Sequence, residues 1–172
     1  APALSPSGGS GGSAWGVSIG DFDGDNRPDL AVRAFTGVTV SFFLNGSSTG
    51  SISFSSSPIL VVTTGSSSSQ ARSSLAIGDL DGDGKIDLAA TNYADNTLSV
   101  LRNTSTGIGN LSFTNISYST GTQPESIVFG DMNADSRPDI ALVNSGGNNL
   151  SLFKNILPVP VIVTSFTPAS GP

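Results

Sequence analysis

The aspartates of this chain are concentrated in three short windows that share one spacing. Eleven of the thirteen acidic residues lie in residues 21–29, 79–87 and 131–139, and only Asp95 and Glu125 lie elsewhere. The windows, here called loops 1, 2 and 3, read DFDGDNRPD, DLDGDGKID and DMNADSRPD. Carboxylates this close together repel one another unless a cation neutralises them. The pattern therefore predicts a cation-binding loop in each window.

Each loop offers a set of hard oxygen ligands for one metal ion. Positions 1, 3, 5 and 9 carry carboxylate or amide side chains, and position 7 can add a backbone carbonyl while its cationic side chain points outward. Five or six such ligands on a short turn suit Ca²⁺ better than Mg²⁺, which keeps its waters and a strict octahedron. About three Ca²⁺ ions would cancel the formal net charge of −6. The candidate ligands are Asp21, Asp23, Asp25, Arg27, Asp29, Asp79, Asp81, Asp83, Lys85, Asp87, Asp131, Asn133, Asp135, Arg137 and Asp139.

Two other interpretations of the loops were weighed. Each window alone could be an Asx turn, in which an aspartate caps its own backbone, but three windows in one register favour calcium. An EF-hand requires glutamate at position 12, where these loops have Val32, Ala90 and Leu142. Loop 3 is the weakest candidate, since Asn133 replaces an acid and Ala134 replaces a glycine.

The composition excludes several other chemistries. The 172 residues include no His and no Cys, which excludes a Ser-His-Asp triad, imidazole or thiolate metal sites and disulfides. Seven basic residues against thirteen acidic ones do not favour nucleic-acid binding. No apolar run approaches the ~20 residues that span a membrane. The clustered acids are all accounted for as metal ligands, so we expect no enzymatic activity.

The loops belong to a longer repeat. They begin at residues 21, 79 and 131, which gives periods of 58 and 52 residues, and such periods indicate a propeller or an array. Short apolar strands flank each loop, and a third strand ends on an asparagine 16 residues after the last aspartate. These asparagines are Asn45, Asn103 and Asn155. A fourth strand is predicted in the first two units, beginning at 52–54 and 111–113 and continued by 59–62 and the residues around Ile116.

This periodicity predicts an all-β fold, a β-propeller-type array of three four-stranded antiparallel blades with a calcium loop between strands 1 and 2 of each. The blades occupy about 14–70, 71–122 and 123–156, and residues 1–13 are predicted to be a flexible linker. The third unit lacks the fourth-strand pattern. The segment 157–172 is interpreted as a strand or linker that completes this blade or pairs with a neighbour.

The stretches IGDFDGDNRPDLAV, IGDLDGDGKIDLAA and FGDMNADSRPDIAL, with NTLSVLRN downstream, resemble the FG-GAP/VCBS repeats of integrin-alpha-like propellers. The resemblance covers about residues 13–156. It implies a β-propeller with calcium in the strand 1–2 loops and an extracellular or cell-surface location, but no single activity. The terminal VIVTSFTPASGP also resembles the opening strand of an IPT/TIG immunoglobulin-like domain. Closed propellers usually have four or more blades, whereas this chain supplies three.

These observations predict a calcium-stabilised structural or adhesive module of a secreted or surface protein. We expect association with further copies of the chain, as in a fibre, or with neighbouring domains. The alternative is a glycan- or protein-binding propeller module of a secreted enzyme or adhesin. Candidate N-glycosylation sequons lie at Asn45, Asn103, Asn110, Asn115 and Asn149. The scattered basic residues Arg33, Arg72, Arg102 and Lys154 are interpreted as solvated surface.

Overall fold

A computed structural model describes residues 14–34, 39–66 and 74–157 of the chain. These residues form eleven strands and no helix, so they include no helix that could cross a membrane. The strands are β1 (Ala14–Gly20), β2 (Asp29–Ala34), β3 (Thr39–Phe43), β4 (Leu60–Thr63), β5 (Leu75–Gly78), β6 (Asp87–Asn92), β7 (Thr97–Asn103), β8 (Phe113–Ser119), β9 (Pro124–Gly130), β10 (Asp139–Asn144) and β11 (Asn149–Phe153). The predicted linker 1–13 and the tail beyond Leu157 lie outside the described residues.

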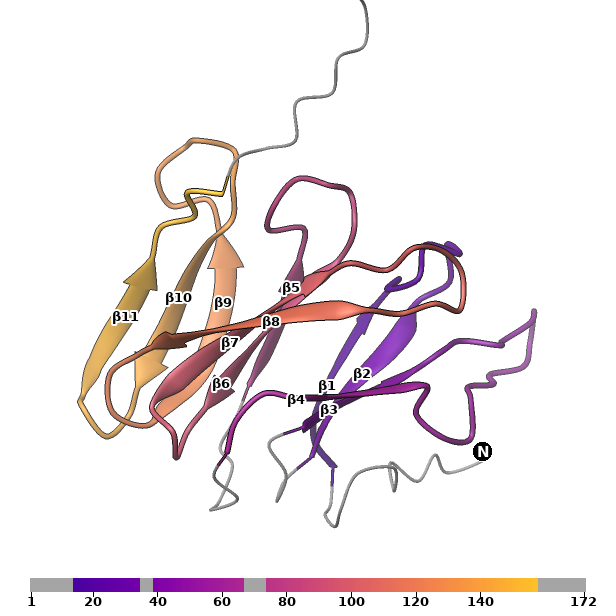
Figure 1. Cartoon of the computed structure of the whole chain (residues 1–172), viewed down its shortest axis with the longest axis horizontal. Helices are drawn as coiled ribbons and strands as arrows, with labels where there is room; N and C mark the ends of the chain where they lie inside the picture. The colour runs from indigo at the N-terminus through magenta and orange to yellow at the C-terminus, as the bar shows by residue number, and fades with distance from the viewer. Residues whose placement is uncertain (1–13, 35–38, 67–73, 158–172) are drawn as a thin grey trace, which may run out of the picture.

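The strands form three antiparallel sheets that stand side by side in chain order (Figure 1). Blade 1 has the order β1-β2-β3-β4, blade 2 the order β5-β6-β7-β8, and blade 3 the order β9-β10-β11. The predicted all-β array of antiparallel blades is therefore confirmed. Blade 3 has three strands within the described residues, where the array pattern predicted four.

The fourth strand of blade 1 begins later in the chain than predicted and is formed by the predicted continuation at 59–62. Residues 52–54 form no strand and contribute only an isolated bridge between Asn45 and Phe54. The preceding residues fold back on themselves at Gly50, whose φ is +78°, and Ser48 pairs with Ser51. The strand that completes the sheet is β4, which pairs with β3. The tight turn thus delays the strand until residue 60.

Both faces of blade 2 are apolar because side chains alternate between the two faces of a strand. We call the face toward the preceding blade the N-side face and the opposite one the C-side face. The N-side face packs on blade 1 through Leu75, Ile77, Leu88, Ala90 and Leu101. The C-side face packs on blade 3 through Ala76, Ala89, Leu98 and Val100. The hydrophobic core therefore lies between the blades, in two layers.

The two layers are filled differently. Between blades 1 and 2, Phe42 meets Phe22 edge-to-face at 5.3 Å and stacks on Phe113 at 4.6 Å between ring centroids. In blade 2 the positions equivalent to Phe22 and Phe42 hold Leu80 and Val100, which line a largely apolar cavity of about 230 Å³ beside blade 3. Aromatic packing thus makes the first layer the better filled one.

A glycine directly before each of loops 1 and 2 lets the next blade approach the backbone. A Cβ added at Gly20 would lie 3.0 Å from Ile86 Cδ1 and 3.1 Å from Ile77 Cδ1. A Cβ added at Gly78 would lie 3.1 Å from the ring of Phe129. These distances are shorter than ordinary van der Waals contacts, so an added methyl group would require the facing side chains to shift by a few tenths of an ångström.

Arg33 joins blades 1 and 2 from inside their interface. It is buried, and its guanidinium donates to Thr64, to the Thr91 carbonyl at 3.3 Å and to Asn92 Oδ1 at 3.0 Å. Desolvation lowers the pKa of Arg33 to about 10, with Asp95 acting in the opposite direction, so the side chain stays charged at neutral pH. The interpretation of Arg33 as solvated surface was wrong.

Phe42→Ala tests whether the first aromatic layer holds the blades together. Phe42 is fully buried, and removal of such a ring should lower the free energy of unfolding by about 3–5 kcal/mol. Ile52→Ala is the control, since the Ile52 side chain is exposed and its truncation should change stability by less than about 0.5 kcal/mol. Denaturant titration measures both. Equal effects of the two substitutions would contradict the packing described above.

Candidate metal centres

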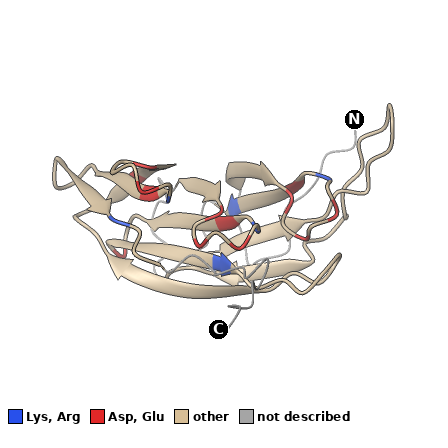
Figure 2. Cartoon of the chain, turned by 90° about the horizontal axis from the view of Figure 1, so that it is seen from above, with Lys and Arg blue, Asp and Glu red and all other residues tan. Residues whose placement is uncertain are grey.

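Loops 1, 2 and 3 connect the first two strands of each blade, as predicted. They join β1 to β2, β5 to β6 and β9 to β10, and they lie at the same end of the sheets (Figure 1). A view from above shows acidic residues in separate patches along the array, with basic residues close by (Figure 2). Each patch is therefore a separate candidate site.

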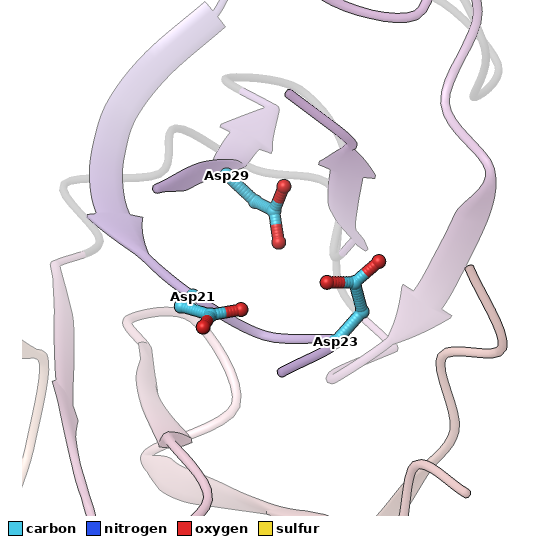
Figure 3. A group of neighbouring side chains, drawn as sticks. All are labelled: Asp21, Asp23 and Asp29. Atoms are coloured by element: carbon cyan, nitrogen blue, oxygen red, sulfur yellow. The ribbon is translucent and has the colours of Figure 1, made fainter. Parts of the chain in front are cut away.

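Loops 1 and 2 each bring three carboxylates together. In loop 1, oxygens of Asp21, Asp23 and Asp29 lie within 4.8 Å of one another (Figure 3). The equivalent residues of loop 2, which are Asp79, Asp81 and Asp87, form the same group. In both groups the residues at positions 3 and 9 are buried. Grouped carboxylate oxygens of this kind form the ligand set that Ca²⁺ uses in proteins.

The aspartate at position 1 shapes the turn. Asp21 accepts hydrogen bonds from the amides of Gly24 and Asn26, both at 2.8 Å. Asp79 accepts the equivalent bonds from Gly82 at 2.7 Å and Gly84 at 2.9 Å. These are the bonds of an Asx-type turn. The Asx-turn interpretation of the loops therefore describes part of their geometry. The same loops also gather their carboxylates, which a cap alone does not require.

The turn needs left-handed backbone at positions 4 and 6. Loop 2 places glycine at both, with φ of +75° at Gly82 and +83° at Gly84. Loop 3 places Ala134 and Ser136 there, both at +63°. Side-chain-bearing residues adopt this region at a cost that glycine avoids. Loop 3 is therefore strained where loop 2 is relaxed.

The aspartate at position 9 ties each loop to the end of the third strand. Its Oδ2 accepts the amide of position 2 and its Oδ1 accepts the amide of the asparagine 16 residues later. For Asp87 these donors are Leu80 at 2.8 Å and Asn103 at 2.7 Å. The same pairs of bonds occur at Asp29 and at Asp139. The sequence shows the 16-residue spacing between this aspartate and the asparagine, but it does not indicate that the two residues are hydrogen-bonded.

The asparagine also reaches the preceding blade. Asn103 Nδ2 donates to the Ile86 carbonyl of its own blade at 3.1 Å and to the Phe22 carbonyl of blade 1 at 2.9 Å. Asn155 Nδ2 reaches the Leu80 carbonyl of blade 2 in the same way, at 2.5 Å. We call this contact the asparagine latch. It connects blades 2 and 3 to the carbonyl at position 2 of the preceding loop.

The latch bears on the predicted glycosylation sites. Asn45 and Asn103 are buried, and their amide nitrogens donate to backbone carbonyls. A glycan on either nitrogen would break these bonds, so these two sequons do not suit the folded chain. The other three asparagines, Asn110, Asn115 and Asn149, are exposed and remain predictions.

Basic side chains contact the loops more closely than predicted. Arg27 Nε donates to Asp25 at 2.7 Å, and Lys85 lies 3.7 Å from Asp83, so the position 7 side chains of loops 1 and 2 turn back to position 5 instead of pointing outward. Arg102, interpreted as solvated surface, is half exposed but contacts the carboxylate of Asp81. Its place at the end of β7, beside loop 2, becomes evident only from the fold.

The buried aspartates are electrostatically unfavourable without a cation. Burial raises the pKa of Asp87 to about 6 and also raises the pKa of Asp29, against the lowering effect of their backbone hydrogen bonds. By contrast, the hydrogen bond from Arg27 lowers the pKa of the Asp25 carboxyl. A cation between the carboxylates would stabilise the ionised form of the buried residues. The chemistry of loops 1 and 2 therefore fits a divalent metal.

Loop 3 is arranged differently, although the structure describes all of it. Asp131 and Asp135 are exposed, and Asn133 Nδ2 donates to Asp139 at 3.3 Å. Its acids form no group of three like those of loops 1 and 2. Of the predicted ligands, the structure thus brings together positions 1, 3 and 9 of two loops. Position 5 instead accepts the position 7 amide in all three, through Asp25, Asp83 and Asp135.

Two family models match the chain. The FG-GAP repeat matches residues 13–53, which include loop 1. The FG-GAP-like repeat matches residues 79–142, which include loops 2 and 3. Together the matches cover more than half of the chain, and neither extends to the tail 157–172, so the IPT/TIG resemblance gains no support. A search of curated proteins gave no match.

Ala134→Gly tests the strain in loop 3. Glycine should relieve the left-handed backbone and raise the free energy of unfolding by about 0.5–1 kcal/mol. Ala141→Gly in β10 is the matched control and should lower stability by a similar amount, because the same change there only adds freedom to the unfolded chain. Chemical denaturation measures both. Destabilisation by both substitutions would contradict a strained loop 3.

The metal-free protein should show the burial of Asp87 in its pH dependence. The Asp87 pKa is about 6 in the folded chain against a usual value of 3.8. Between these values the folded state holds a proton that the unfolded state has lost, so this contribution to stability falls as pH rises. Asp87→Asn removes it. The Tm of Asp87→Asn minus that of the wild type should therefore increase from pH 4 to pH 7, and a constant difference would contradict the assignment.

Proposed function

Because the chain belongs to the FG-GAP-type repeat family, we propose that it is a calcium-stabilised structural or adhesive module of an extracellular protein. Repeats of this family are commonly extracellular, adhesion-related modules. The single observation that carries the calcium proposal is the grouping of buried carboxylates in loops 1 and 2. The clustered acids serve as cation ligands in this proposal, so the module is not an enzyme.

Calcium is favoured over magnesium by the kind of ligand set. The side chains at positions 1, 3, 5 and 9 and the carbonyl at position 7 would supply mainly protein oxygens on one short turn. Ca²⁺ accepts such crowded and irregular sets, whereas Mg²⁺ retains waters. Loops 1 and 2 would bind first. Loop 3 would bind last, because Asn133 replaces a carboxylate and Asp131 and Asp135 are exposed.

The ion would stabilise more than its own loop. Asp87 accepts the amides of Leu80 and Asn103, and Asn103 in turn holds the Phe22 carbonyl of blade 1. In loop 1, Asp23 Oδ2 accepts the amide of Gly109 from blade 2 at 2.8 Å. A cation that fixes these carboxylates would therefore also fix contacts between blades. Calcium is thus proposed as a ligand of the folded array.

A second candidate function is binding of a glycan or protein at the loop end. The observation in its favour is a cavity of about 560 Å³ between loops 1 and 2, which is lined by both polar and apolar groups, including Asp23, Lys85 and Ser105. Cavities of this size accommodate small ligands. A glycan array probed in calcium and in chelator would test it. Specific signals that need calcium would favour binding over a purely structural role.

Calorimetric titration tests calcium binding directly. The wild type should take up calcium at loops 1 and 2 with Kd on the order of 10⁻⁴ to 10⁻³ M, as in extracellular modules. Asp23→Ala and Asp81→Ala should each remove one of these sites. Glu125→Gln is the matched control, because Glu125 lies outside the loops.

Thermal melts provide a second readout for the same variants. Metal that binds only the folded state stabilises it by about 2.7 kcal/mol per site at a concentration 100 times Kd. Chelation should therefore lower the Tm of the wild type more than that of either loop variant. The proposal would be wrong if the wild type took up no calcium at millimolar metal and melted identically in chelator.

A further inference from the structure

The two ends of the array expose large apolar faces. On the C-side face of blade 3, Leu150 and Leu152 are 64% and 62% exposed. On the N-side face of blade 1, Val17 and Ile19 are 61% and 60% exposed. Contiguous apolar surface of this kind on a sheet marks an interaction site. Between these ends lie the two buried layers that the chain itself forms.

Repeat positions show that each exposed face has a buried counterpart. Leu150 of blade 3 corresponds to Leu98 of blade 2 and Val40 of blade 1, which are both fully buried by the following blade. Val17 of blade 1 corresponds to Ile127 of blade 3, which is buried by the preceding blade. The exposed C-side and N-side faces are therefore the two halves of an interface that the chain already makes twice.

The glycine contact gives this correspondence a specific fit. Ile77 packs on Gly20 and Phe129 packs on Gly78, in both cases a side chain of the first strand on the glycine of the preceding blade. The next glycine in the series is Gly130, and a Cβ added there would meet nothing within 4 Å. The side chain equivalent to Ile77 and Phe129 in blade 1 is Ile19. The space at Gly130 and the side chain of Ile19 thus match each other and lie at opposite ends of the array.

Among the described residues, the asparagine latch is not formed at the two ends of the array, which are loop 3 of blade 3 and Asn45 of blade 1. Asn103 and Asn155 donate to the position 2 carbonyls of loops 1 and 2. Within the described residues, no hydrogen bond reaches the position 2 carbonyl of loop 3, at Met132, and Asn45 Nδ2 donates only inside its own blade, to Pro28. Met132 is also exposed, whereas its counterparts Phe22 and Leu80 are buried.

From this continuity we propose that blade 3 of one chain packs against blade 1 of a second copy of the same chain. Ile19 of the second copy lies on Gly130, and its Asn45 lies near the Met132 carbonyl. The proposal rests on the proposed role as a structural or adhesive module and names the partner and the surface. Because the two faces differ, the contact is heterologous, and repeating it gives either a closed ring or an open filament.

Two substitutions block the opposite halves of this contact. Gly130→Glu places a charge in space that no described residue fills, and Ile19→Glu places one on the exposed face of blade 1. Both chains should fold, and each should self-associate more than about tenfold more weakly than the wild type. Ile108→Glu is the matched control, because Ile108 is exposed in the loop between β7 and β8. Sedimentation velocity in calcium measures the association.

Mixing the variants distinguishes this contact from a symmetric one. Each variant keeps the half that the other has lost, so an equimolar mixture should form dimers that neither chain forms alone. A wild type that sediments as a monomer at high concentration, or a mixture that stays monomeric beside an associating wild type, would overturn the proposal.

Calcium uptake by the same samples, measured by calorimetry, separates the two proposals. Normal uptake by a wild type that does not associate would overturn only the head-to-tail contact. Association by the predicted pattern without calcium uptake would support the contact and contradict the proposed function.

Discussion

The buried aspartate at the end of each loop is the constraint on which the rest of the array depends. Asp29, Asp87 and Asp139 are each buried and each accept two backbone amides, one from the loop and one from the end of the third strand. These bonds fix where the loop returns to the sheet. The two hydrogen bonds satisfy the carboxylate as an acceptor, but its negative charge is still removed from water. A bound cation would offset this desolvation cost.

The same aspartate connects the loop to the interface between blades. In blades 2 and 3, the asparagine that donates its backbone amide to this aspartate also bonds to the preceding blade, so loop, third strand and neighbouring sheet form one hydrogen-bonded unit. Beside this polar unit lies an apolar layer in which alternating side chains of one blade meet those of the next. A blade is therefore stabilised mainly by its neighbours, as in other repeat proteins. The outer faces of blades 1 and 3, which have no neighbouring blade among the described residues, follow directly from this construction.

Much of this could be predicted from the sequence, because the aspartate spacing and the apolar alternation are local patterns that repeat. These patterns predict the all-β fold, and they also predict that the loops lie between strands 1 and 2 of each blade. Contacts between distant residues could not be predicted in the same way. Arg33 was interpreted as a surface residue because burial by another blade leaves no local signal. Arg102 is half exposed, and its contact with Asp81 joins residues that are 21 positions apart in the chain. The sequence shows that Asn103 lies 16 residues after Asp87, but not that its side chain bonds to the preceding blade. The late start of β4 depends on the tight turn at Gly50, which the sequence pattern did not indicate.

The central claim is that the carboxylates of loops 1 and 2 form cation sites that are integral to the folded array. Crystals grown with calcium, and anomalous diffraction recorded at a long wavelength, test it most directly. Anomalous peaks are expected between Asp21, Asp23 and Asp29 and between Asp79, Asp81 and Asp87, with Arg102 displaced from Asp81 in the second loop. Diffraction from such crystals without peaks at either group, with Arg102 still on Asp81, would contradict it.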